Sequence, residues 1–133
     1  MMKLVKYLFL IIFVICCDVG IKLENDNGPT KIKLETDVLF IKTDGSNVAT
    51  IKAHLFYDDA RAGAGHEIKF SASQNNIRVG RFSDLGKSET NENGIATVKF
   101  YADSANIDTN DVINIIAKFD TTTGIYDLRP VAP

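Results

Sequence analysis

Short runs of alternating apolar and polar residues cover most of the chain beyond residue 30. In the clearest run, residues 49–57, every odd-numbered position is apolar or aromatic, whereas Thr50, Lys52 and His54 hold even-numbered positions. Side chains alternate between the two faces of a strand, so this period of two predicts a β-strand with one buried face. A helix would distribute the same apolar residues around all of its sides.

The same alternation predicts further short strands along the body of the chain. They lie at Lys31–Glu35, Val38–Ile41, Glu67–Ser73, Ile77–Phe82, Ala96–Ala102, Ile113–Phe119 and Ile125–Leu128. Between them, Gly and Asn tolerate the positive φ of tight turns. The predicted turns lie at Asp44-Gly45, Gly63-Ala64-Gly65, Asn93-Gly94 and Thr123-Gly124. About seven short strands separated by such turns predict an all-β protein, folded as an antiparallel β-sandwich of two sheets.

The first seventeen residues follow a different pattern. Lys3 and Lys6 precede an apolar run from Leu8 to Ile15. A basic start followed by an apolar core of this length is typical of a secretory signal peptide. A membrane-spanning helix needs about 20 apolar residues, whereas Asp18 ends this run early. We therefore predict a signal peptide over residues 1–17.

The stretch Val14-Ile15-Cys16-Cys17 resembles a lipobox, in which a small residue precedes the cysteine that is acylated on sulfur. Cys17 fits the acceptor position, with Cys16 in the small position before it. If Cys16 were the acceptor, the bulky Ile15 would stand in the small position, so we favour Cys17. An uncleaved anchor, or an ordinary signal peptide with chance cysteines, is the alternative. The prediction is a lipoprotein of the bacterial cell envelope, held to a membrane by its acyl chains.

Asp18 bears on which membrane holds the lipoprotein. In enterobacterial lipoproteins, an Asp directly after the acceptor cysteine resembles the signal for retention in the inner membrane. Other bacterial lineages do not follow that rule, so the choice between inner and outer membrane stays open.

The rest of the chain divides into a tether and one domain. Residues 18–30 are polar and irregular, with Asn25-Asp26-Asn27-Gly28-Pro29 at their centre, and this composition predicts a flexible tether. Residues 31–133 have room for a single domain with one core. Both cysteines precede Asp18, so the domain has neither a disulfide nor a thiolate metal site.

Charge argues against nucleic acid as a partner. All seventeen acidic residues follow the predicted cleavage point and only Lys3 and Lys6 of the fifteen basic residues precede it, which leaves a side-chain charge of −4 after cleavage. Nucleic acid demands clustered Lys and Arg. Along the sequence, Arg78, Arg81 and Lys87 are interspersed with acidic residues, so we expect a surface of mixed charge.

No motif in the chain predicts catalysis or a cofactor. His66-Glu67 would begin a zinc-protease motif, but position 70 is Phe70 rather than a second histidine. His54 lies on the polar parity of its strand and is expected to face solvent. No Gly-x-Ser-x-Gly motif holds a nucleophile. We therefore expect neither an enzyme nor a bound cofactor or metal.

Calcium is the one metal that the loop composition brings into question. Residues 25–28 and 103–111 offer carboxylate and amide oxygens, but neither stretch has the spacing of a calcium-binding loop. Asp and Asn in loops usually serve turns instead, which is the interpretation we favour here.

Three stretches resemble the bacterial immunoglobulin-like domains of the invasin and intimin adhesins. Asp44-Gly45-Ser46, which leads into the strand that starts at Ala49, resembles the family's Asp-Gly turn. Residues 58–71 resemble the loop that precedes an apolar-x-Phe-Ser strand, and residues 90–98 resemble the family's Thr-Asp-x-x-Gly-x-Ala turn and strand entry. The resemblance spans roughly residues 32 to 120. It implies an immunoglobulin-like sandwich of about seven strands with Greek-key connections, used as a spacer or an adhesive unit.

Function is predicted only in outline. Aromatic side chains are favoured in binding hot spots, so Phe56, Tyr101 and Tyr126 are candidates for a contact surface, with core packing as the alternative. The leading hypothesis is a non-enzymatic, lipid-anchored module that acts in adhesion or binds a protein or glycan partner at the cell envelope. The second hypothesis is a periplasmic structural or assembly lipoprotein that docks onto a membrane complex.

Overall fold

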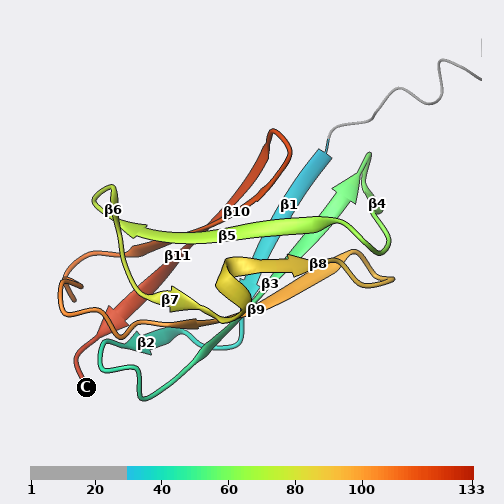
Figure 1. Cartoon of the computed structure of the whole chain (residues 1–133). Coiled ribbons are helices and arrows are strands. Elements are labelled where there is room, and N and C mark those ends of the chain that lie inside the picture. Colours follow the sequence, from blue (N-terminus) through green and yellow to red (C-terminus); the bar gives the residue numbers. More distant parts are fainter. Residues whose placement is uncertain (1–29) are drawn as a thin grey trace, which may run out of the picture.

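The computed structural model of the chain describes residues 30–133, which form two β-sheets packed face to face (Figure 1). The first sheet, called the β3 sheet below, has five strands: β1 (Thr30–Thr36), β3 (Ala49–Tyr57), β4 (Ala60–Arg61), β7 (Arg81–Phe82) and β9 (Ile95–Tyr101). They follow the order β1-β3-β9-β7, with β4 added beside β3. Every neighbouring pair in this sheet is antiparallel.

The second sheet, called the β5 sheet below, contains the remaining strands. They are β2 (Phe40–Lys42), β5 (Glu67–Gln74), β6 (Ile77–Arg78), β8 (Lys87–Glu89), β10 (Ile113–Phe119) and β11 (Thr122–Val131). Their order is β2-β11-β10-β5-β6, with β8 beside β5. Only β2 and β11 pair in parallel; the other pairs are antiparallel. The predicted all-β, antiparallel sandwich is thus confirmed, with one parallel pair that the sequence pattern did not predict.

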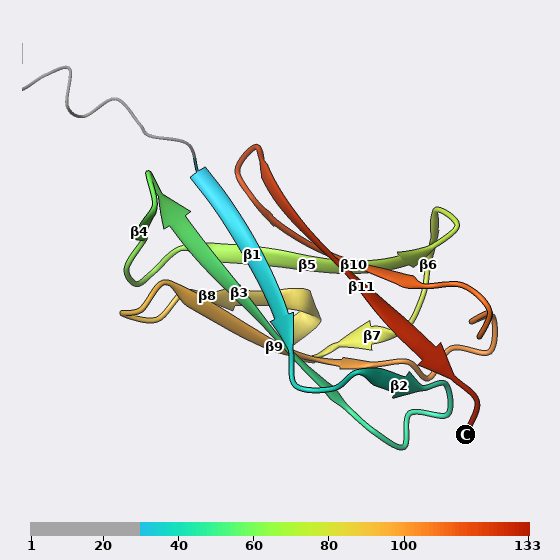
Figure 2. The ribbon, with the colours of Figure 1, turned by 180° about the vertical axis from the view of Figure 1, so that it is seen from behind.

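The predicted signal peptide, the acceptor Cys17 and residues 18–29 of the tether lie outside the described residues. Within residues 30–133, no helix is long and apolar enough to span a membrane. Thr30 and the C-terminus lie at opposite ends of the sandwich, as the view from behind also shows (Figures 1 and 2). The chain therefore enters the domain at one end and leaves it at the other.

The apolar parity of the predicted strands forms the core between the sheets. In β3, Ala49, Ile51, Ala53 and Leu55 are buried, as the alternation predicts, whereas Tyr57 at the end of the strand is exposed. The larger fully buried side chains of the other strands are Ile41, Ile68, Val98, Phe100, Ile113, Ile115, Leu128 and Pro130. Their packing against one another is the main source of stability in a sandwich of this kind.

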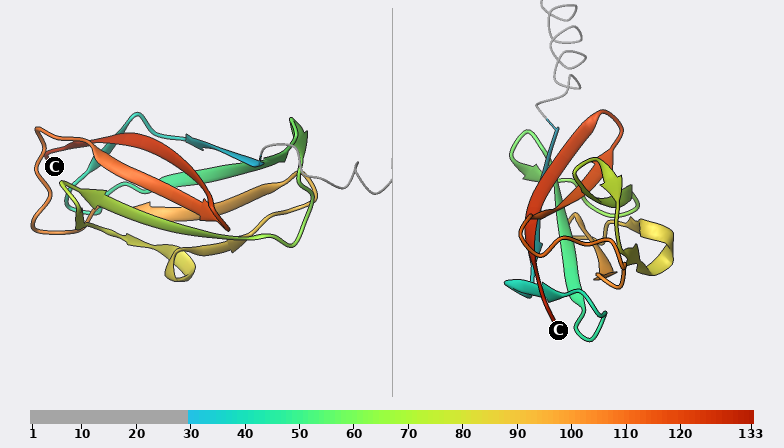
Figure 3. Two further views of the ribbon diagram at one scale, coloured as in Figure 1. Left: turned by 90° about the horizontal axis from the view of Figure 1, so that it is seen from above. Right: turned by 90° about the vertical axis from the view of Figure 1, so that its left-hand side faces the viewer.

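Several connections carry the chain from one sheet to the other, as Greek-key connections do. Among them are those from β4 to β5 and from β9 to β10. The chain also changes sheet between β1 and β2, where the Asp37 carboxylate accepts a hydrogen bond of 2.8 Å from the backbone N–H of Thr50 in β3. The layers that result are seen edge-on in Figure 3.

The prediction of a single strand over Ile77–Phe82 is wrong. Its first half, β6, pairs with β5, whereas its second half, β7, pairs with β9 of the opposite sheet. The change of sheet occurs across Gly80, which has a φ of 67°. A Cβ atom at this position would lie 2.5 Å from the Phe100 ring, so the crossing requires glycine both for its backbone conformation and for space.

The turn predicted at Thr123-Gly124 is also wrong. The chain reverses at Asp120, with a φ of 52°, and Phe119 pairs with Thr122 across this turn. Gly124 lies inside β11 instead. A Cβ atom there would lie 2.7 Å from the backbone oxygen of Ile32 in β1. This glycine is required for the close approach of two strands rather than for a turn.

Two of the stretches that carried the family resemblance meet through Thr90, which is buried. Its hydroxyl donates a hydrogen bond of 2.7 Å to the backbone oxygen of Gly63 and accepts one of 3.0 Å from the backbone N–H of His66. After it, the Asn91 carboxamide oxygen accepts hydrogen bonds from the backbone of Asn93 and Ile95. These residues therefore specify the structure of loops, and the turn predicted at Asn93-Gly94 is confirmed.

Candidate functional site

A groove runs along the side of the sandwich where β5 faces β7 and the turn η1 (Ser83–Gly86). It consists of two adjoining hollows of about 410 and 270 Å³, which share Phe70, Ser71, Arg78 and Leu85 among their lining residues. Volumes of a few hundred Å³ are typical of ligand sites. We call this feature the β5 groove.

The groove exists because β5 is only partly paired on this side. β6 pairs with β5 at its C-terminal end and β8 pairs with it from Glu67 to Lys69. Neither strand pairs with Phe70, Ser71 or Ala72, although the Ala72 oxygen accepts a hydrogen bond from the backbone of Val79. Between β6 and β8 this edge therefore has no neighbouring strand, because β7 pairs in the opposite sheet; Val79 and Gly86 contact it instead.

The turn η1 forms one wall of the groove in an unusual conformation. Asp84, Leu85 and Gly86 have φ values of 52°, 56° and 75°. Gly86 packs so closely on β5 that a Cβ atom would lie 2.6 Å from the Phe70 oxygen. Leu85 is 93% exposed, and the left-handed conformation costs an L-residue with a side chain about 1–2 kcal/mol. The turn projects from the sandwich (Figure 3, yellow) and displays an apolar side chain at a cost in stability.

Three exposed lysines form a row across the face of the β5 sheet beside the groove. Lys69 of β5 lies directly opposite Lys87 of β8 on one side and Lys118 of β10 on the other. Among residues 30–133, neither these lysines nor Arg78 forms an ion pair. Like charges directly opposite one another destabilise a sheet. The fold thus holds a local cluster of positive charge that an anionic partner would stabilise.

All charged residues that line the two hollows are basic: Lys69, Arg78, Arg81, Lys87 and Lys118. The described part of the chain carries 12 basic and 14 acidic side chains, so this concentration runs against its overall balance. Along the sequence these basic residues are interspersed with acidic ones, and at this face the fold groups them. The lysines are 18 and 31 positions apart along the chain and only strand pairing brings them together.

Acidic residues limit the positive patch. Glu67 and Glu89 form the next cross-strand pair along β5 and β8, and Asp84 precedes Leu85 in η1. Arg81 at the far side of the groove is already engaged, since its Nε donates a hydrogen bond of 2.6 Å to Asp103. The available cations are thus the lysine row at one end of the groove and Arg78 toward the other.

The structure does not bring the three predicted contact residues together. Phe56 and Tyr101 are half-buried on the outer face of the β3 sheet, where Phe56 stacks on His54 and Tyr101 lies 4.0 Å from the Arg81 guanidinium. In the register of β3 and β9, Tyr101 lies level with position 48, which is eight positions from Phe56 along β3. Eight residues of strand span about 26 Å. Tyr126 packs against the core from β11. They form no common surface.

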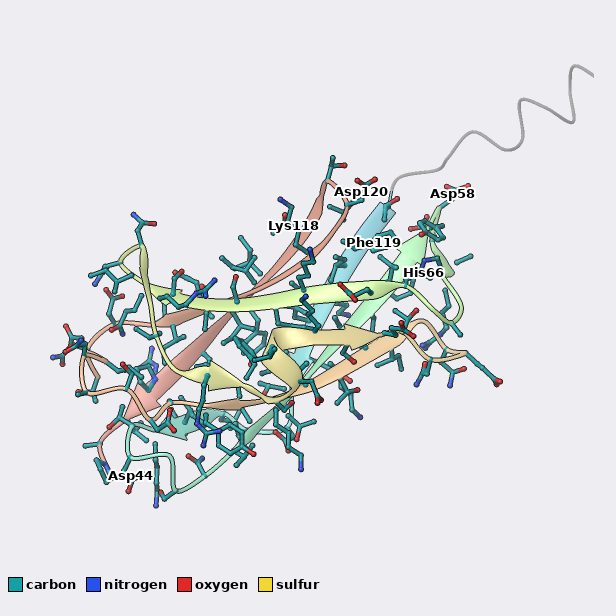
Figure 4. All side chains as sticks on the ribbon, viewed as in Figure 1. Asp44, Asp58, His66, Lys118, Phe119 and Asp120 are labelled. Carbon is teal, nitrogen blue, oxygen red and sulfur yellow. The ribbon has the colours of Figure 1, made fainter. Side chains whose placement is uncertain are left out.

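Both histidines have structural neighbours. His66 packs its ring against Tyr57 and Phe119 at centroid distances of 5.5 and 5.3 Å, at the end of the sandwich where the chain enters (Figure 4). His54 Nε2 lies 3.0 Å from Glu35 Oε1. This contact with His54 lowers the pKa of Glu35 below its ordinary value of 4.5.

The acidic loop at residues 103–111 uses its oxygens locally. One Asp108 carboxylate oxygen accepts hydrogen bonds from the backbone and side chain of Asn110, and Asp111 accepts one from Val112. The buried Gln74 carboxamide donates to the backbone oxygens of Asp108 and Asp111 at 2.7 and 3.0 Å. In residues 30–133, no three His, Cys, Asp or Glu side chains are grouped as metal ligands.

Comparison with known proteins places the fold. No protein-family model matches the chain, and no curated protein does. Among solved structures, it is similar to the "D0-D1 domain of Intimin", with 14% identity and a TM-score of 0.56 over 76% of this chain. It is also similar to the "D00-D0 domain of Intimin", with 18% identity and a TM-score of 0.54 over 77% of this chain.

The chain spans only 49% and 44% of these intimin segments, about half of each. At such identities the similarity establishes the fold alone. It nevertheless agrees with the independent resemblance in the turn and loop sequences. The domain is an immunoglobulin-like β-sandwich of the kind found in intimin.

Proposed function

We propose that the chain is a non-enzymatic, lipid-anchored binding module of the bacterial cell envelope. Its sandwich would hold a protein partner through the β5 groove. The observation that carries this proposal is the lysine row beside the β5 groove, which has no ion-pair partner among residues 30–133, on a fold that intimin also uses. Complementary charge between this row and an anionic partner would favour their association.

The predicted anchor limits where the partner can be. From Cys17 to Thr30 the chain has thirteen residue steps, which span at most about 45 Å when fully extended. The domain therefore stays close to the membrane that holds the acyl chains. A partner in or on the same membrane is within easy reach.

This short reach favours a second candidate function alongside adhesion. A domain that docks onto a complex in its own membrane needs no more than this length. Docking within the cell envelope is accordingly a function to be tested together with adhesion.

Anchoring is tested by metabolic labelling with palmitate. We expect Cys17→Ser to abolish labelling and to release the protein from the membrane fraction, because the acceptor sulfur is lost. Cys16→Ser is the matched control and should retain both labelling and membrane association. Persistent labelling of Cys17→Ser, or loss of labelling in Cys16→Ser alone, would overturn the assignment of the acceptor.

Protease treatment of intact cells separates adhesion from internal docking. Degradation of the domain in intact cells supports the adhesion function. Protection in intact cells, followed by degradation once the outer barrier is opened, supports docking inside the envelope. Recovery of the protein from the cytosol would contradict both functions.

A further inference from the structure

We infer that the β5 groove binds an extended segment of a partner protein that carries two acidic residues four positions apart and an apolar residue midway between them. This inference rests on the proposed binding function and gives the chemistry of its partner. It follows from the positions of three features along β5: the lysine row, the exposed Leu85 and Arg78.

The lysine row is the first anchor. Neighbouring strands lie about 4.8 Å apart, so the backbones of Lys87, Lys69 and Lys118 together span roughly 10 Å across the sheet. None of them has a carboxylate partner among the described residues. A carboxylate on a partner would relieve their mutual repulsion and form charge-assisted hydrogen bonds.

Arg78 is the second anchor, and its distance from the row sets the spacing. Arg78 pairs with Ser73, which lies four residues along β5 from Lys69. Four residues of strand span about 13 Å. An extended segment that lies over the outer face, parallel to β5, has the same rise, so side chains at its positions i and i+4 would reach the lysine row and Arg78. Arg also binds a carboxylate with two parallel hydrogen bonds.

The middle of the groove is apolar. Leu85 lines both hollows and Ile116 lines the smaller one, so the residue at position i+2 of the segment would meet them. Here Phe70, Ser71 and Ala72 lack a strand neighbour on the groove side.

A peptide fits these features better than an anionic membrane or polysaccharide does. A membrane would meet the whole face at once, including the Glu67–Glu89 pair and Asp84, which anionic lipid repels. A single extended segment is narrow enough to follow the cations and avoid those carboxylates. A sugar chain would gain little from the groove aromatics, because Phe70 is only 6% exposed and Phe82 packs between Phe70 and Phe100.

Fluorescence anisotropy with the full-length protein in detergent micelles tests the inference. The probe is a labelled peptide with Glu at positions i and i+4, Leu at i+2 and Ser or Gly elsewhere; a matched probe has Gln in place of both Glu. We expect binding of the acidic probe that weakens as salt rises, and at least tenfold weaker binding of the Gln probe. Equal binding of the two probes would overturn the inference.

Charge-removing variants test the site itself. The double variant Lys69→Gln with Lys118→Gln should raise the dissociation constant of the acidic probe at least tenfold. The matched double variant Lys33→Gln with Lys52→Gln, which removes two exposed lysines of the β3 sheet, should leave it unchanged. Circular dichroism of both variants establishes that they are folded. Equal affinities in the two double variants would refute the assignment to the β5 groove.

Competition distinguishes other anionic partners. The labelled peptide is displaced in turn by phosphatidylglycerol vesicles, by soluble polygalacturonate and by the unlabelled acidic peptide. If either of the first two displaces it at a lower concentration of negative charge than the unlabelled peptide does, the choice of a peptide partner is overturned. Failure of the acidic probe to bind, with palmitate labelling intact, refutes this inference and leaves the anchored module standing. Peptide binding without labelling would refute the anchor alone.

Discussion

Replacement of Leu85 tests whether the backbone of the turn η1 beside the groove is strained. The backbone at Leu85 is left-handed, with φ 56° and ψ 25°, which costs about 1–2 kcal/mol for a residue with an ordinary side chain. Because Leu85 is 93% exposed, its burial contributes only about 0.1–0.2 kcal/mol of the 1.5–3 kcal/mol available from a fully buried leucine. The free energy of unfolding should therefore rise when this residue is replaced by one that tolerates the conformation.

We expect Leu85→Asn to stabilise the protein by about 1 kcal/mol, since Asn enters the left-handed region more readily than Leu. For a domain of this size that corresponds to a rise in Tm of roughly 4–8 °C, measurable by circular dichroism. Ile77→Thr is the control, because Ile77 is also exposed but has no positive φ, and its effect should stay within about 0.5 kcal/mol.

The same variant should bind the acidic probe more weakly, because it removes an apolar contact. A gain in stability with a loss of affinity is the pattern expected of a residue kept for binding. An unchanged or lower Tm for Leu85→Asn would show that the strain argument is wrong.

Three further changes test the fold. Thr90→Val should cost about 1–3 kcal/mol by urea unfolding, because it removes the hydrogen-bond partner of two half-buried backbone groups, the Gly63 oxygen and the His66 N–H. Wild-type stability would contradict that role. Gly124→Ala should cost about 1–3 kcal/mol, since its Cβ would lie 2.7 Å from the Ile32 oxygen; a stabilised variant would mean that β1 and β11 separate freely. The lowered pKa of Glu35 beside His54 contributes stability above pH 4.5, and this stability is lost as the pH falls below that value. The Tm of Glu35→Gln should therefore depend less on pH in the acidic range than the Tm of the wild type. Identical Tm profiles of the two proteins would exclude the contribution.

Much of the fold was predictable because strand alternation is a local property. The buried parity of β3 follows from residues 49–57 alone, and the same holds for β9 and β10. The turn at Asn93-Gly94 was predictable for the same reason, since its conformation depends on the residues within it. The signal peptide and the acceptor Cys17 stay predictions, because they lie outside the described residues.

Gly80 and Gly124 have structural roles that the local sequence pattern does not reveal. The sequence presents Gly80 and Gly124 as ordinary breaks in a pattern, and the predictions of a continuous strand at one and a turn at the other were wrong. Each glycine is needed because another strand passes within contact distance of its backbone. Such a close approach is a property of packing, so no window of sequence around the residue reveals it.

The sequence by itself determined the class of the fold, the faces of its main strands and the absence of cysteine from the domain. Only the tertiary structure decided where its charges gather. Lys69, Lys87 and Lys118 belong to three strands, and each is unremarkable among its sequence neighbours. Strand register sets them side by side, while the change of sheet across Gly80 opens the groove next to them. Register and sheet assignment depend on contacts between distant segments, and the candidate site exists only through those contacts.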